Sequence, residues 1–127
     1  MGPFPSVADL AAAYRDAVRT PVDVVDEALE RIERLEPSLN AFAHRMADEA
    51  RAEARLRTGE LRAGQDRGPL HGIPVAIKDL IEVAGVPTGY GSKVEPPRIA
   101  DRDAPLVARL RVAGAVILGK TNLLEYA

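Results

Sequence analysis

The hydrophobic residues from position 6 to about 57 recur at helical spacing, which predicts a helical N-terminal segment. Ser6, with Asp9 three residues further on, resembles a capping box that starts the first helix. Thr20 and Pro21 mark the start of a second helix, which we expect to end at Pro37. The hydrophobic stripe of this second helix is formed by Val22, Val25, Leu29, Ile32 and Leu35.

The helical pattern weakens after the second helix. NAFA, residues 40–43, is interpreted as a short strand or a link. A third helix is predicted from about His44 to Arg57, and its apolar face consists only of Met46 and a few alanines. We therefore expect this helix to lie on the surface and a polar loop, residues 59–68, to follow it.

Short apolar runs bounded by Gly and Pro replace the helical spacing in the second half of the chain. IPVAI (73–77) and AVIL (115–118) contain β-branched residues and lie between breakers, so both predict buried strands. The stretch 85–102 is rich in Gly and Pro and predicts an ordered loop.

A fourth helix is predicted between these two strands, in DAPLVARLRVAG. Asp103 is its expected N-cap, Pro105 lies in its first turn, and Gly114 follows its last turn as a C-cap. The residues expected to face inward are Leu106, Val107, Leu110 and Ala113. A strand, a connection with a helix and a second strand form a crossover unit, which predicts that the two strands are parallel.

The order of these elements defines the expected fold class as α/β. Residues 1–58 form a mainly helical segment, and residues 68–127 form the strand–loop–helix–strand start of a mixed β-sheet flanked by helices. A chain of 127 residues suffices for one domain of ordinary size, and 46% hydrophobic and 28% charged residues are typical of a globular protein.

Composition excludes several classes of protein and site. The net charge of −2 gives no basic footprint for nucleic acid, and no run approaches the roughly 20 apolar residues that span a membrane. The absence of Cys excludes a disulfide framework and a thiolate metal site, and it fits a reducing compartment, so we expect a cytoplasmic location. His44 and His71 stand at unrelated positions, so neither a metal site nor a cofactor is implied.

The first six residues spell M-G-x-x-x-[ST], a pattern for myristoylation. We set this pattern aside because no basic patch follows it to supply the second anchor that stable membrane attachment requires.

The stretch GAVILGKT, residues 114–121, fits the written pattern of a phosphate-binding P-loop. A working P-loop has a strand before its first Gly and a helix after its Lys. Here a predicted helix precedes Gly114, and the four residues between the two glycines form the predicted strand. We therefore reject nucleotide binding and interpret Lys120 as a solvated or salt-bridged residue at the end of that strand.

Lys78 directly follows the first predicted strand and is the candidate for chemistry. Ligand crevices form at the carboxyl ends of parallel strands, and alternation places Lys78 on the same face as Pro74 and Ala76. These small, apolar neighbours are expected to disfavour the charged form, and a neutral Lys serves as a general base or as a base relay to a Ser nucleophile. The alternative is a structural ion pair between Lys78 and Asp79 or Glu82.

The chain contains two long blocks, GPLHGIPVAIKDLI (68–81) and DAPLVARLRVAGAVILGKTNLLEYA (103–127). They resemble the amidase signature family both in their residues and in their order along the chain. Enzymes of this family hydrolyse amide bonds, or release ammonia from amides for transfer, with a Ser–cis-Ser–Lys triad. The Lys of the triad occupies the VAIKD position, so the resemblance implies that Lys78 accepts a proton from the bridging Ser. The resemblance also implies a small-molecule amide substrate. It accounts for GKTN as a sequence motif of the family.

The sequence departs from this family in lacking the Gly/Ser-rich segment that carries both catalytic serines. Its own serines are Ser6, Ser38 and Ser92, and Ser92 lies in GYGSKV without a Ser-Gly-Gly run, so it receives no triad role. Asn122 and Glu125 resemble a capping box that opens a helix, of which only a few residues are present.

We therefore expect the chain to be the N-terminal portion of an amidase-type hydrolase that is inactive alone. Its expected partner is the C-terminal part of the enzyme or another subunit. The alternatives are a portion of an amidotransferase subunit, and a non-catalytic interaction module or remnant that binds a partner through its amphipathic N-terminal helices.

Overall fold

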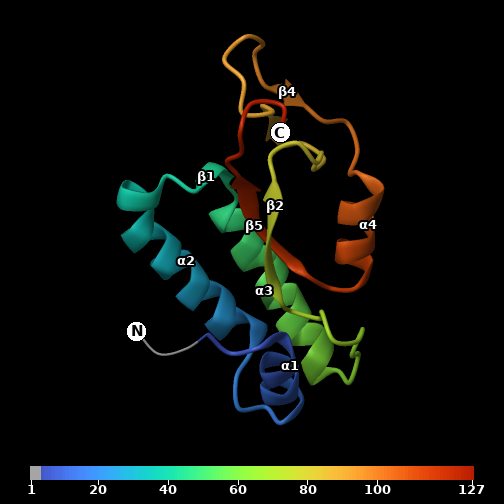
Figure 1. Cartoon of the computed structure of the whole chain (residues 1–127). Coiled ribbons are helices and arrows are strands. Elements are labelled where there is room, and N and C mark those ends of the chain that lie inside the picture. The colour runs from blue at the N-terminus through green and yellow to red at the C-terminus, as the bar shows by residue number, and fades with distance from the viewer. Residues whose placement is uncertain (1–3) are drawn as a thin grey trace.

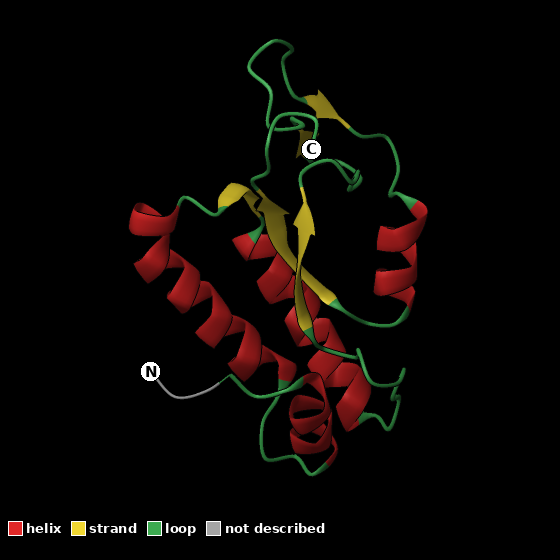
Figure 2. Ribbon diagram, in the orientation of Figure 1, coloured by secondary structure: helices red, strands yellow, loops and turns green. Residues whose placement is uncertain are grey.

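The computed structural model describes residues 4–127, so the first three residues of the myristoylation pattern lie outside the described part. In this described part of the chain, helices surround a small group of strands (Figure 2). The helices are α1 (Val7–Arg15), α2 (Pro21–Leu39), α3 (Ala47–Arg62) and α4 (Pro105–Val112). The strands are β1 (Phe42–Arg45), β2 (Pro74–Lys78), β3 (Pro87–Thr88), β4 (Arg98–Ile99) and β5 (Val116–Thr121).

β5 is the central strand of a three-stranded sheet with the order β1-β5-β2. β1 pairs with β5 in the antiparallel sense and β2 in the parallel sense, which confirms the predicted mixed sheet and crossover. Helices α2 and α3 cover one face of this sheet, and α4 lies on the other (Figure 1). β3 and β4 form a separate antiparallel pair inside the segment that was predicted as a loop.

The main core joins α2, α3 and β5. Its buried members are Val25, Leu29, Ala50, Ala54, Val116 and Leu118. The prediction of a surface helix ending at Arg57 was therefore wrong, because α3 runs to Arg62 and buries its alanine face. Alanine has almost no side chain, so its face lets the helix axis approach α2 and the sheet closely, which a hydrophobicity pattern understates.

α1 docks onto the connection between α3 and β2. Leu10 and Tyr14 are buried beside Val24 and Ile73. The Tyr14 hydroxyl donates a hydrogen bond of 3.1 Å to the carbonyl of Gly72, and burial raises the pKa of Tyr14 to about 12, so the donor keeps its proton. The predicted capping box of α1 forms, and α2 starts at Thr20 and Pro21 as predicted. Thr20 and Asp23 form a second capping box, which was not predicted.

α2 continues through Pro37 and ends at Leu39, so the prediction that Pro37 ends this helix was wrong. A proline there removes one hydrogen bond to the carbonyl of Glu33. Both residues are exposed, so water can hydrate the freed carbonyl. The helix is closed instead by Asn40, which adopts a left-handed conformation and donates its N–H to the Glu36 carbonyl at 2.9 Å.

Two predicted helix starts in the second half differ from the structure. Ala104, not Asp103, is the N-cap of α4, and Asp103 accepts a hydrogen bond from the Ala84 N–H and pairs with Arg111. The capping box at Asn122 does not form, because the Asn122 side chain donates to the carbonyl of Asn40 at 2.8 Å.

The residues of α4 that were predicted to face inward are covered unequally. Val107 is fully buried, Leu110 is partly buried, and Leu106 is 51% exposed. None of the helices in residues 4–127 has the length and hydrophobicity that a membrane span requires.

Candidate active site

Lys78 is the last residue of β2, and its partner across the ladder is Thr121, the last residue of β5. Because the two strands are parallel, their carboxyl ends meet at the same edge of the sheet, as predicted. The side chain of Lys78 is exposed and lies on the sheet face of Pro74 and Ala76. Its carbonyl accepts a hydrogen bond of 2.9 Å from the Ile81 N–H, which holds the turn that follows the strand.

The predicted alternative, an ion pair between Lys78 and Asp79 or Glu82, does not form. Asp79 pairs with Lys120, and Glu82 pairs with Arg98. Within residues 4–127 the Lys78 ammonium therefore has no carboxylate partner. The expected desolvation by neighbouring side chains is also absent there, because the Ala76–Lys78 end of this face is exposed.

Lys120 is fully buried, with 0% of its side chain exposed. Its Nζ lies 2.9 Å from Asp79 Oδ1 and 3.1 Å from Thr88 Oγ1, so the salt-bridged interpretation is confirmed and the solvated one is wrong. Its burial results from a bulge in β5: Val75 pairs with Ile117 and Ala76 with Gly119, which leaves Leu118 as an extra residue. The bulge turns Lys120 toward the α4 face of the sheet.

The two glycines of GAVILGKT have structural roles that replace the phosphate-binding one. Gly114 has φ +84° and closes α4, with its N–H donating to the Arg111 carbonyl at 3.0 Å. Gly119 lies next to the bulge, where β1 pairs with β5. A Cβ at this position would lie 2.3 Å from the His44 carbonyl oxygen. The strand predicted over 115–118 is present as β5, but it starts at Val116 and continues through Gly119 to Thr121.

His71 is a buried loop residue that makes hydrogen bonds. Its Nδ1 accepts a hydrogen bond of 2.9 Å from the Arg67 N–H, and its Nε2 lies 2.9 Å from Glu60 Oε2. Burial lowers the pKa of His71, although the nearby Glu60 carboxylate opposes this shift. Burial alone would raise the pKa of Glu60, but hydrogen bonds from Arg57 and Arg67 hold it below its usual value.

The charged cluster around His71 was not predicted from the sequence. Arg57 is 5% exposed, and both its neighbours Glu53 and Glu60 accept hydrogen bonds from it. The spacing of four and three residues along α3 was the available signal, but such pairs are usually solvated. No group of His, Cys, Asp and Glu able to hold a metal ion occurs in the described part of the chain.

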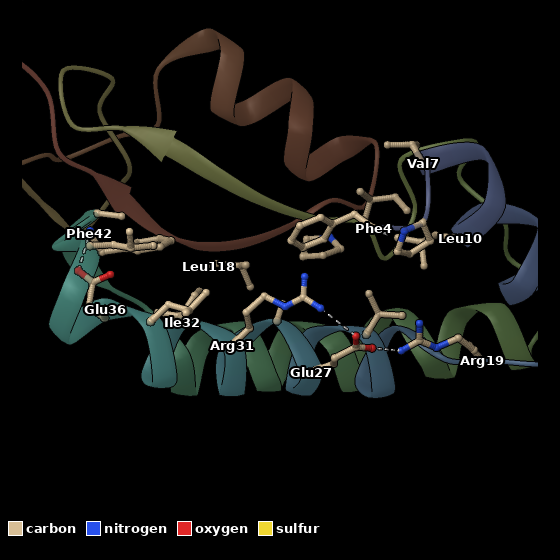
Figure 3. Close-up of a pocket in the computed structure, with 18 residues that line it drawn as sticks. Phe4, Val7, Leu10, Arg19, Glu27, Arg31, Ile32, Glu36, Phe42 and Leu118 are labelled. Carbon is tan, nitrogen blue, oxygen red and sulfur yellow. Dashed lines mark hydrogen bonds and ion pairs between the residues drawn. The ribbon is translucent and has the colours of Figure 1, made fainter. Parts of the chain in front are cut away.

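An apolar groove of about 420 Å³ lies on the same sheet face as Lys78, between α2 and the strands (Figure 3). Ile32, Phe42 and Leu118 form its walls together with Phe4, whose ring lies 4.1 Å from Arg31 Cζ. The carboxylates of the groove are already engaged: Glu27 pairs with Arg19 and Arg31, and Glu36 accepts from the Phe42 N–H. The groove therefore offers apolar surface and no free catalytic group.

Ser92, the serine nearest in sequence to Lys78, is engaged elsewhere. Its hydroxyl donates a hydrogen bond of 2.7 Å to Glu125 and accepts one of 3.1 Å from the Val94 N–H. In the described part of the chain, Lys78 therefore lies at the carboxyl end of a parallel strand with no serine hydroxyl bonded to it.

The comparisons with known proteins identify the family to which the chain belongs. The model of the family described as Amidase matches residues 23–127, and the chain belongs to this family. The crystal structure of native peptide amidase from Stenotrophomonas maltophilia is similar to it with a TM-score of 0.90 and 43% sequence identity, over 98% of this chain and 27% of that one. This likeness confirms the predicted family and fold class.

Curated relatives include both kinds of enzyme that the sequence suggested. The putative amidase AmiB2 of Mycobacterium tuberculosis (strain ATCC 25618 / H37Rv) is 45% identical over 122 residues, which are 96% of this chain and 26% of the relative. A glutamyl-tRNA(Gln) amidotransferase subunit of Gloeothece citriformis is 41% identical over 109 residues, 86% of this chain and 23% of the relative. The chain thus spans about a quarter of the length of these relatives.

Proposed function

We propose that residues 1–127 supply the lysine base of an amidase-type hydrolase that cleaves carboxamide C–N bonds by a Ser–cis-Ser–Lys mechanism. The observation that carries the proposal is Lys78: it is accessible at the carboxyl edge of β2, inside the block that resembles the family, and within residues 4–127 it has no ion-pair partner. The two serines belong to sequence outside these residues. A cytoplasmic location is part of the proposal and is supported by the cysteine-free composition.

In the proposed reaction, neutral Lys78 accepts a proton from the bridging serine, which in turn accepts one from the nucleophilic serine. The nucleophile attacks the amide carbonyl, the C–N bond breaks, and the nitrogen leaves as ammonia or an amine after receiving a proton back along the same relay. Water then cleaves the acyl-enzyme and restores the serine. Covering the exposed end of the Lys78 face by the rest of the enzyme would favour the neutral form of the lysine.

A chimera tests this proposal. Residues 1–127 replace the matching quarter of the Stenotrophomonas maltophilia peptide amidase, which has 43% identity and a TM-score of 0.90 over this region. We expect the chimera to release ammonia from a peptide amide and residues 1–127 alone to release none. A folded chimera without activity, or Lys78-dependent activity of the isolated 127 residues, would contradict the proposal.

Amidotransfer is the second candidate function, because curated relatives at 38–41% identity are named as amidotransferase subunits. The chemistry at Lys78 would be the same, and the fate of the ammonia would differ. Release of free ammonia by the chimera with no other protein added favours the hydrolase. Activity that appears only with partner subunits and an acceptor favours the amidotransferase.

A further inference from the structure

A buried ion pair lies directly beneath the edge that carries Lys78. Lys120 has no exposed side-chain surface, and Asp79 is 5% exposed. Besides Asp79, the Lys120 ammonium contacts the Thr88 hydroxyl at 3.1 Å and the Pro87 carbonyl at 3.4 Å. The pair therefore joins the end of β5 to the start of β3.

Asp79 uses all of its polar groups in this connection. Its N–H donates to the Thr121 carbonyl at 2.9 Å, and its carbonyl accepts from the Tyr90 N–H at 3.1 Å. Its Oδ2 accepts from the Gly89 N–H at 3.1 Å, while Oδ1 binds Lys120. The peptide that follows Lys78 is thus fixed to β5 on one side and to residues 87–90 on the other.

Stability alone does not account for such a pair. The cost of removing two charges from water is large, and well-packed neutral residues of similar volume are often as stable or more stable. What a hydrogen-bonded pair supplies here is a single geometry at the end of β2. Lys120 and Asp79 point toward the α4 face, whereas Lys78 lies on the opposite face, so neither can contact a substrate that Lys78 reaches.

We propose that Asp79 and Lys120 are positioning residues for Lys78: the buried pair holds the backbone at the end of β2 so that the Lys78 amine is aimed in one direction. The inference rests on the proposed function, in which Lys78 is the base. A displacement of about 1 Å at a reacting group can reduce the rate roughly 100-fold, so a backbone clamp next to the base has kinetic consequences.

The test uses the peptide amidase chimera and measures kcat, KM and the denaturation midpoint. The decisive variant is the double substitution Asp79→Asn/Lys120→Met, which removes both charges and nearly keeps the volume. We expect its midpoint to stay close to that of the parent chimera. Its kcat is expected to fall by about 100-fold with KM changed less than about twofold, because orientation and not substrate binding is lost.

The matched control is Arg111→Met/Asp103→Asn, which removes another ion pair in the same chain, 2.8 Å long and remote in sequence from Lys78. Its kcat should equal that of the parent. A double variant at Asp79 and Lys120 that keeps the parent kcat would overturn the inference, because the pair would then be structural only. The inference would also be overturned if kcat fell in both double variants in proportion to the fall in their denaturation midpoints.

A milder variant tests the positioning role of the ion pair if the double variant does not fold. Thr88→Val retains the ion pair and removes the hydroxyl that joins Lys120 to β3. We expect a severalfold lower kcat at unchanged KM, and an unchanged kcat would count against the inference. Lys78→Met separates the two proposals: if it retains full activity, the proposed function fails, whereas an inactive Lys78→Met beside an active double variant refutes only the positioning role.

Discussion

At Gly72 the chain passes so close to α2 that no side chain fits. Its φ is +75°, and an added Cβ would lie 2.4 Å from Pro21 Cγ. We predict that Gly72→Ala lowers the free energy of unfolding by roughly 2–4 kcal/mol, because overpacking and a left-handed backbone act together. Urea denaturation measures the change.

Gly59→Ala is the matched control. Gly59 lies within α3, is exposed, and has no atom within 4 Å of the added Cβ. Alanine is the better helix former, so this variant should be more stable by roughly 0.5–1 kcal/mol. Equal effects of the two substitutions would show that the close contact between Gly72 and Pro21 is absent.

The lowered pKa of His71 predicts that the folded protein becomes less stable in acid. Burial lowers the pKa of His71 below its ordinary value of 6.5, so the unfolded chain binds a proton more readily than the folded one. Stability is therefore fully present above pH 6.5 and falls as the pH drops through 6.5 toward the lowered pKa. Denaturant midpoints between about pH 7.5 and 5.5 should decline for the parent and be flat for His71→Asn, which does not titrate. An equally steep decline in His71→Asn would exclude His71 as the cause.

The position of the Lys120 side chain shows why the surroundings of a single residue are hard to predict from the sequence. Strict alternation from Val116 would place it wrongly, because one extra residue at Leu118 reverses the faces of everything that follows. The available signal was Gly119 inside an apolar strand, since a glycine there often marks a bulge or a close backbone approach. The partner of Lys120, Asp79, lies 41 positions away and could be found only from the fold.

At the scale of elements, α3 depends on the small size of its buried face. Ala54 is 1% exposed and packs among α2 and β5 residues, whereas Ala52 on the same helix is exposed. We predict that Ala54→Leu costs roughly 1–3 kcal/mol of stability through overpacking, and that Ala52→Leu changes stability by less than about 0.5 kcal/mol. Thermal denaturation distinguishes them. A tolerated Ala54→Leu would mean that α3 lies further from the sheet than described.

Elements with a clear period were predictable and those without one were not. α2, β2 and β5 were found in the expected places because their apolar residues follow a helical stripe or a continuous run, although α2 and β5 both extend beyond their predicted ends. β3 and β4 have two residues each, too few for any pattern. The start of α3 was misplaced because β1 and the helix share a stretch without a strong period.

At the scale of the whole molecule, the sequence predicted a mixed sheet with Lys78 at its carboxyl edge, and both are present. The exposure of Lys78 was not foreseen, because desolvation depends on which elements cover the edge and not on the neighbours along the strand. The catalytic role of Lys78 comes from the family resemblance and stays a prediction.

The most direct measurement is the kcat/KM of the peptide amidase chimera with Lys78→Met beside that with Lys93→Met. The chain contains only three lysines, and Lys93 is exposed like Lys78 but lies in the connection between β3 and β4. We predict that Lys78→Met lowers kcat/KM by at least about 10²-fold, as expected for loss of a general base, and that Lys93→Met leaves it unchanged. Folded variants with equal activity would contradict the assignment of Lys78 as the base.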